Sequence, residues 1–199
     1  MVSRWVSTGP AEPLAALVRH VKALTDKGYW VLLVTAKTPA TVLQQAAHAA
    51  GVSPERLAVA DAMSRPGGVG PAAGDGKAIF VQAPSLLELL LMRAEKVVWG
   101  QRAARTHIIV HDINTFALYN PPQAIEQMAR YLMGRVRSYT TVDFLVDPRA
   151  TLPSELRSFF EGFCPVKANL DSLPAPEPAV VKGDEAERRS ADRVPRAVA

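Results

Sequence analysis

The chain of 199 residues lacks the features that mark secreted, membrane-spanning or disulfide-bonded proteins. A single cysteine, Cys164, excludes an internal disulfide framework and fits a reducing compartment. No apolar run approaches the ~20 residues that a helix needs to cross a bilayer. The first residues lack a charged segment followed by an apolar one, so no signal peptide is visible. These absences predict a soluble cytoplasmic protein.

Motifs that would identify a reaction are also missing. The sequence has no G-x-G-x-x-G dinucleotide fingerprint, no G-x-S-x-G nucleophile elbow and no cysteine cluster for zinc. Residues 70–78 look like a phosphate-binding loop, but Pro71 stands where the first glycine is needed and Ala78 replaces the Ser/Thr. We therefore predict a flexible loop over residues 63–76, which hold five glycines and two prolines.

Composition allows a folded core but gives little information about partners. Apolar residues form 48% of the chain, which is ordinary for a globular protein. The net charge of +4 is too small to indicate nucleic-acid binding alone. Two basic clusters could contact an acidic partner or a nucleic acid, although solvated surface is the simpler interpretation. They comprise Arg93, Lys96, Arg102 and Arg105, then Arg130, Arg135 and Arg137.

The most informative stretch is Thr106–Asn120. Ile108, Ile109 and Val110 follow one another without a polar break, which is typical of a strand buried on both faces of a parallel sheet. Asp112 comes directly after this strand. The carboxyl ends of such strands are where α/β sheets usually bind ligands.

Strands and helices alternate along the chain. This alternation predicts a three-layer α/β/α fold with a mostly parallel central sheet. We expect one domain over residues 1–170 and a disordered tail over 171–199, which is rich in proline, alanine and charge. Expected strands lie at 2–7, 29–35, 57–60, 79–81 (a strand or an extended lead-in), 107–111 and 141–146. One expected helix ends at residue 27, and a second ends before residue 51. Three further helices are expected at 84–98, 122–136 and 153–163.

Several of these segments resemble the RecA/KaiC-like ATPase domain, a P-loop NTPase fold, and in particular archaeal relatives that have lost the phosphate loop. GYWVLLVTAKTPATVLQQAAHAAGV resembles that family's second strand and helix, and LAVADAMS its short strand ending in an aspartate. SLLELLLMRAEKVV followed by HIIVHDINTFALYN resembles its helix and Walker B strand. The resemblance covers roughly residues 1–163 and implies a fold rather than a reaction.

The chain departs from that family where ATP chemistry would occur. In place of the Walker A loop stand residues 7–13, STGPAEP, which have no lysine, two prolines without amide donors and a glutamate that would repel phosphate. After the second strand, where the family places catalytic acids, the sequence reads Thr35, Ala36 and Lys37. Only the Walker B-like Asp112 remains, so we expect no ATP hydrolysis.

Candidate site residues follow from this comparison. Any nucleotide or ligand, with ATP and Mg²⁺ as the implied cofactors, would contact Thr8, Gly9, Asp112 and Asn114. Asp112 is either a magnesium ligand or a carboxylate that caps the following turn, and we favour the cap. His107 and His111 share a face of the same strand and suggest a metal site with Asp112, but structural histidines are the more economical interpretation.

Three functional hypotheses remain open. The first is a non-catalytic, regulatory or protein-interaction module that pairs with itself or with a true ATPase, as RecA-like domains do. The second is a nucleotide-binding protein with an atypical phosphate site at residues 7–13. The third is a nucleic-acid-associated protein that uses the two basic clusters.

Overall fold

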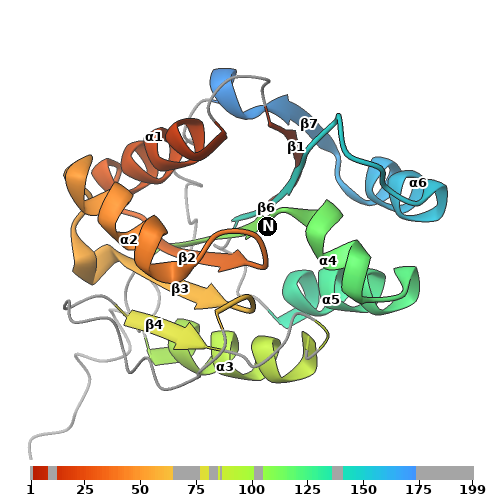
Figure 1. Cartoon of the computed structure of the whole chain (residues 1–199), viewed down its shortest axis with the longest axis horizontal. Helices are drawn as coiled ribbons and strands as arrows, with labels where there is room; N and C mark the ends of the chain where they lie inside the picture. Colours follow the sequence, from red (N-terminus) through yellow and green to blue (C-terminus); the bar gives the residue numbers. More distant parts are fainter. Residues whose placement is uncertain are drawn as a thin grey trace, which may run out of the picture.

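The computed structural model describes residues 2–8, 13–64, 77–80, 85, 87–100, 105–135 and 141–173. In these ranges seven parallel strands form one sheet in the order β4-β3-β2-β5-β6-β1-β7 (Figure 1). The strands are β1 (Val2–Ser7), β2 (Trp30–Thr35), β3 (Leu57–Asp61), β4 (Lys77–Phe80), β5 (Thr106–His111), β6 (Thr141–Val146) and β7 (Val166–Asn169). The helices are α1 (Pro13–Asp26), α2 (Ala40–Ala49), α3 (Leu87–Gly100), α4 (Ile113–Tyr119), α5 (Pro122–Arg135) and α6 (Ser154–Phe163), with 3-10 turns η1 (Pro54–Arg56) and η2 (Leu170–Ser172).

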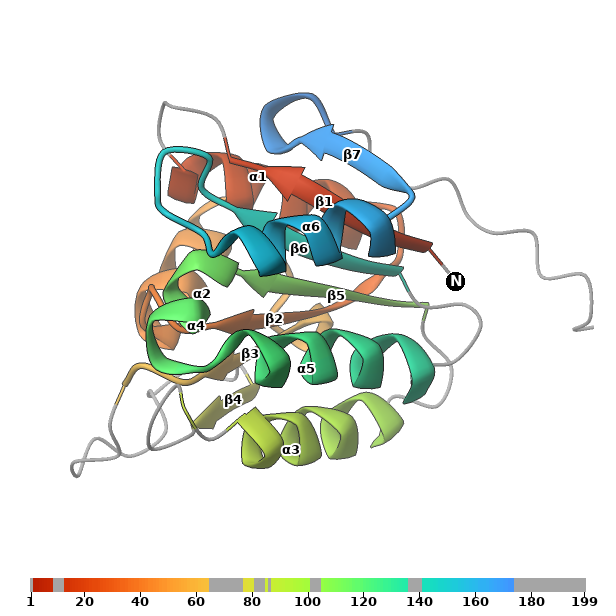
Figure 2. The same ribbon diagram turned by 90° about the vertical axis from the view of Figure 1, so that its right-hand side faces the viewer.

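Helices cover both faces of the sheet, which confirms the predicted three-layer α/β/α fold. The path from β1 through β2 to β3 runs one way across the sheet, and the path from β4 through β5 and β6 runs back. Because parallel crossovers are right-handed, opposite directions place the connecting helices on opposite faces. Accordingly α1 and α2 lie on one face, and α3, α5 and α6 lie on the other (Figure 2).

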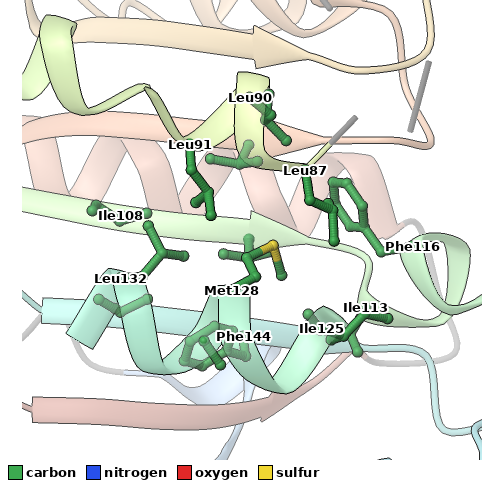
Figure 3. Packing of buried hydrophobic residues seen from close by; sticks show 14 of the residues in the cluster. Leu87, Leu90, Leu91, Ile108, Ile113, Phe116, Ile125, Met128, Leu132 and Phe144 are labelled. Carbon is green, nitrogen blue, oxygen red and sulfur yellow. The ribbon is translucent and has the colours of Figure 1, made fainter. Parts of the chain in front are cut away.

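The larger of the two apolar cores lies between the sheet and helices α3 and α5. All six residues of the central strand β5 are buried, as the unbroken apolar run at its centre predicts. Each large apolar side chain fully buried here stabilises the fold by about 1.5–3 kcal/mol. Figure 3 shows this packing, with Leu87, Leu90 and Leu91 from α3 and Ile125, Met128 and Leu132 from α5 facing Ile108 and Phe144.

The predicted strands and helices are present, and two glycines end helices as expected. Gly28 has a φ of +86° after α1, and Gly51 has a φ of +77° after α2. Glycine adopts this left-handed backbone without the steric cost that other residues meet. The segment near residue 79, predicted as a strand or an extended lead-in, is the strand β4.

Two elements were not predicted. Asp112 was expected to cap a turn, but the stretch after it forms the short helix α4, which buries Ile113 and Phe116. The strand β7 adds an outer edge beside β1 and is largely exposed.

The predicted domain boundary after Leu170 falls inside η2, where Leu170 is buried in the core beneath α1. The rest of the predicted tail, from residue 174, lies outside the described residues.

No helix in the described ranges combines the length and the apolar character needed to span a bilayer.

Candidate functional site at the carboxyl edge of the sheet

The sheet has a topological switch point, where the chain leaves neighbouring strands toward opposite faces. From β2 the chain continues into α2 on one face, and from the adjacent β5 it continues into α4 and α5 on the other. Such divergence at the carboxyl ends of strands is where α/β folds bind ligands. The polar side chains that meet at this point are Thr35, Lys37, His111 and Asp112.

Asp112 caps the amino end of α4. Its Oδ1 accepts a hydrogen bond from the backbone N–H of Asn114 at 3.1 Å, and its Oδ2 accepts one from the Thr115 hydroxyl at 3.3 Å. Asp112 is therefore a capping residue of α4. Its backbone has a φ of 106°, a conformation that non-glycine residues adopt rarely and at a cost of about 1–3 kcal/mol. The cap and the surrounding packing hold this geometry.

Lys37 supplies the cation beside Asp112. Its Nζ lies 2.8 Å from Oδ2 of Asp112, and the Asp112 side chain is only 7% exposed. The turn that presents Lys37 is fixed by Thr35, whose hydroxyl oxygen accepts the N–H groups of Lys37 and Thr38, each at 3.2 Å. An ammonium group therefore neutralises the one Walker B-like carboxylate that the sequence retains.

His111 lies beneath this ion pair. Its Nδ1 is 3.5 Å from the Thr35 hydroxyl oxygen. Burial lowers the pKa of His111 to about 4; the Asp112 charge opposes this shift, and the Lys37 charge adds to it. The imidazole is consequently neutral near pH 7 and adds no charge beside the Lys37–Asp112 pair.

Asn114 lies next to Asp112 but is bonded to the loop after β6. Its Oδ1 accepts the N–H of Asp147 at 2.9 Å, and its Nδ2 donates to the carbonyls of Ala150 and Thr151 at 3.2 and 3.4 Å. Asn114 therefore joins α4 to the segment that leads into α6.

Thr8 lies at the end of β1, separated from β5 by β6. Both its N–H and its hydroxyl donate to the carbonyl of Val146, at 2.9 and 3.3 Å. Of the four predicted contact residues, the structure brings Asp112 and Asn114 together, places Thr8 two strands away, and leaves Gly9 outside the described residues.

Asp61 is a second acidic residue at the carboxyl edge, and it is fully buried. Its Oδ2 accepts the N–H of Ala40, the first residue of α2, at 2.7 Å. Its Oδ1 accepts the N–H groups of Met63 and Ser64 at 2.7 and 2.8 Å. Like Asp112, it stabilises a helix start, where carboxylates satisfy unpaired amides.

A second polar cluster lies under α1, away from this edge, and sequence reasoning missed it. We call it the Arg4 network; it comprises Arg4, His20, His107 and Asp143. The Arg4 guanidinium donates to both oxygens of Asp143, with Nε–Oδ1 and Nη2–Oδ2 distances of 2.6 Å. His107 Nε2 lies 2.7 Å and His20 Nε2 lies 3.1 Å from Asp143 Oδ2. All four residues are at most 6% exposed.

Protonation states in the Arg4 network follow from its geometry. An ionised carboxylate only accepts, so both imidazoles present Nε2–H to Asp143. Burial opposes the Asp143 charge, but His107, His20 and Arg4 together hold the pKa of that carboxyl well below its usual value. Burial also lowers the pKa of His107; its pairing with Asp143 opposes that shift, and Arg4 and His20 add to it.

This arrangement resolves the predicted grouping of His107, His111 and Asp112. The two histidines do share one face of β5, but His107 pairs with Asp143 and His111 contacts Thr35 at the other end of the strand. His20, His107 and Asp143 bring three possible ligand atoms within 4.8 Å of one another. The Arg4 guanidinium already supplies the positive charge at that point, so an added dication would meet strong repulsion.

A signal for the Arg4 network was present in the sequence. Arg4 and Asp143 interrupt two segments that otherwise read as buried strands, VSRWVS and TVDFLV. Charged residues are rarely buried without a partner, so two opposite charges inside two strands indicate an ion pair between them. His20 had no such signal, because its position on α1 places it over Asp143 only after folding.

The basic clusters are partly engaged within the chain. Arg93 donates to the carbonyl of Phe80, and the Arg130 guanidinium lies over the rings of Phe159 and Phe163 at 5.0 and 5.8 Å. The side chains of Arg102, Arg135 and Arg137 lie outside the described residues.

Comparisons with known proteins show likeness in structure and not in sequence. No known protein family matches the chain, and no curated protein matches it in sequence. An uncharacterised protein of Pyrococcus horikoshii, solved in complex with an unknown peptide, superposes with a TM-score of 0.59 at 13% identity, over 80% of this chain and 74% of that one. A KaiC-like protein of the same archaeon superposes with a TM-score of 0.52 at 14% identity, over 79% and 68%. The chain therefore has a RecA/KaiC-like fold.

Proposed function

We propose that this chain is a non-catalytic RecA/KaiC-like domain that acts as a regulatory or protein-interaction module in the cytoplasm. The observation that carries the proposal is the 2.8 Å contact between Lys37 Nζ and Asp112 Oδ2. A magnesium-binding carboxylate needs free oxygen lone pairs directed at the ion. Both oxygens of Asp112 accept internal hydrogen bonds, and a lysine provides the neutralising charge.

Residues 7–13, where a phosphate-binding loop would stand, support the same conclusion. A nucleotide site needs backbone amides and a lysine directed at the β- and γ-phosphates. Thr8 directs its N–H and hydroxyl at Val146 instead, and residues 7–13 contain no lysine. ATP hydrolysis would therefore have neither its cradle nor its metal.

An exposed apolar pair supports the interaction role. Leu118 and Tyr119, at the end of α4, are 77% and 56% exposed. They follow the Asp112 cap by one or two helical turns, so the rigid carboxyl edge of the sheet positions them. Tyrosine is enriched at protein interfaces, and the exposed leucine beside it adds apolar area that a bound protein segment could cover. The peptide complex of the Pyrococcus relative makes peptide binding the mode to test first.

Two measurements test the proposal. Phosphate release from ATP should stay at the buffer rate, with or without magnesium; turnover that Asp112→Ala abolishes would contradict it. Pull-down from a peptide library should enrich peptides that bind the wild-type protein. The same peptides should bind the control variant Met92→Ser, because Met92 lies on α3, is 62% exposed and is not part of the proposed surface. Binding should be lost in a Leu118→Ser, Tyr119→Ser variant. Equal binding by all three proteins would rule out this surface.

A further inference from the structure

We propose that the Arg4 network is an acid-sensitive latch that holds α1 on the sheet and releases it when the His107 imidazole gains a proton. This goes beyond the proposed interaction role, because it concerns the opposite face of the sheet.

The placement of the four residues makes the latch specific to α1. Arg4, His107 and Asp143 belong to β1, β5 and β6, which the backbone ladder holds together. His20 comes from α1, and its 3.1 Å contact with Asp143 is a buried polar link from that helix to the sheet. Leu17, Val21 and Leu24 of α1 add apolar packing, and Arg19 on the exposed side of the helix pairs with Asp171 of η2 rather than with the sheet.

The network has no place for another proton. Arg4 and Asp143 balance each other in charge, so an added proton on either imidazole leaves a net positive charge in the core. That proton would go to Nδ1, and the Nδ1 atoms of His20 and His107 have no hydrogen-bond partner in the part of the chain that the structure describes. A buried donor without an acceptor is costly, and a buried unbalanced charge is more so.

The surroundings do not offset that charge. Tyr29, which precedes β2, presents its ring to His107 at 5.9 Å, and the His20 and His107 rings are 5.8 Å apart. Cys164, which follows α6, lies close enough to be influenced by the Asp143 charge. Burial keeps its thiol protonated by raising its pKa to about 11. Among the described groups that face the network, Asp143 is thus the one anion, and Arg4 already pairs with it.

The sign of the pH effect follows from linkage. Burial lowers the pKa of His107 in the latched state, whereas a solvated histidine has a pKa of about 6.5. Latching is therefore fully favoured above about pH 6.5 and weakens as the pH falls toward the lowered value. Over that window each pH unit shifts the equilibrium toward release by up to about tenfold through His107.

Hydrogen exchange of the full chain tests the latch. Amide protection of α1, corrected for intrinsic exchange, should fall by about tenfold or more relative to α3 between roughly pH 7.5 and 5.5. His107→Gln keeps an amide donor for Asp143 but removes the imidazole whose pKa burial lowers, so it should lose most of this dependence. His48→Gln, at an exposed position on α2, should behave as wild type. Equal loss of protection in α1 and α3, or an unchanged pH dependence in His107→Gln, would overturn the proposal.

Imidazole NMR of the wild-type chain gives an independent readout if His107→Gln does not fold. We expect a neutral Nε2–H tautomer for His107 above pH ~7 and protonation of that ring that coincides with opening of α1. Opening of α1 while the His107 imidazole remains neutral would overturn the proposal as well.

Discussion

The ammonium group of Lys37 lies 2.8 Å from Oδ2 of Asp112, the residue that directly follows the central strand β5. Lys37 follows β2 and Asp112 follows β5, two strands that are neighbours in the sheet but 75 residues apart in the chain. The pair stabilises a strained backbone at Asp112 and neutralises its charge. It is the observation on which the proposed non-catalytic role rests.

Removing Lys37 should restore some affinity for a metal. In Lys37→Met the Asp112 carboxylate loses its internal cation, so millimolar Mg²⁺ should raise the melting temperature of the variant and leave the wild type unchanged. Without Mg²⁺ the variant should lose up to about 1 kcal/mol, because the Lys37 side chain is 44% exposed. Equal Mg²⁺ responses in both proteins would show that Lys37 does not occupy a cation site.

Arg4 should contribute far more to stability than a surface arginine does. Arg4→Met leaves the fully buried Asp143 without its bidentate partner, and breaking a buried pair costs about 3–5 kcal/mol. The matched control is Arg19→Met, whose partner Asp171 is 3.3 Å away and whose side chain is 65% exposed. That change should cost less than about 1 kcal/mol. Similar urea midpoints for the two variants would contradict the assignment of Arg4 and Asp143 as a buried pair.

His111 should make the fold sensitive to acid at the carboxyl edge. Burial depresses its pKa to about 4 in the folded state, against about 6.5 when unfolded. Its contribution is therefore complete above about pH 6.5 and is lost as the pH falls toward 4, to a total of about 3 kcal/mol. His111→Gln should flatten the stability–pH curve in that window relative to wild type, as followed by urea denaturation. A parallel curve would show that His111 is solvated.

Chain truncation tests the proposed division into a domain and a tail. The η2 turn buries Leu170 and packs Leu173 against the core beneath α1. A chain ending at residue 173 should keep the wild-type melting temperature, whereas Leu170→Ala in that chain should cost about 2–5 kcal/mol. A large loss from the truncation alone would place residues 174–199 in the folded domain.

Most of the strands were predictable from sequence because they are short, mainly apolar runs between turn signals. Ile108, Ile109 and Val110 needed only the observation that parallel strands are buried on both faces. The short helix α4 was missed because Ile113 and Phe116 supply a single helical turn of apolar spacing, too little to distinguish it from a turn. The edge strand β7 was missed because its residues are largely exposed and carry no burial pattern.

The site was less predictable than the fold, because its contacts are remote in sequence. Asp112 was identified from its position after a buried strand, and its role as a cap was anticipated. Lys37 was noted only as a departure from an acidic residue, and its pairing with Asp112 depends on β2 lying beside β5. Arg4 and Asp143 are 139 residues apart and meet because β1 inserts between β6 and β7.

The most direct test of the central claim is calorimetric titration of the chain with ATP and Mg²⁺, repeated on Asp112→Ala. We expect no binding heat from either protein, because Lys37 neutralises Asp112 and residues 7–13 provide no phosphate cradle. Micromolar binding by wild type that is lost in Asp112→Ala would contradict the proposed non-catalytic role and indicate a nucleotide site beside Asp112.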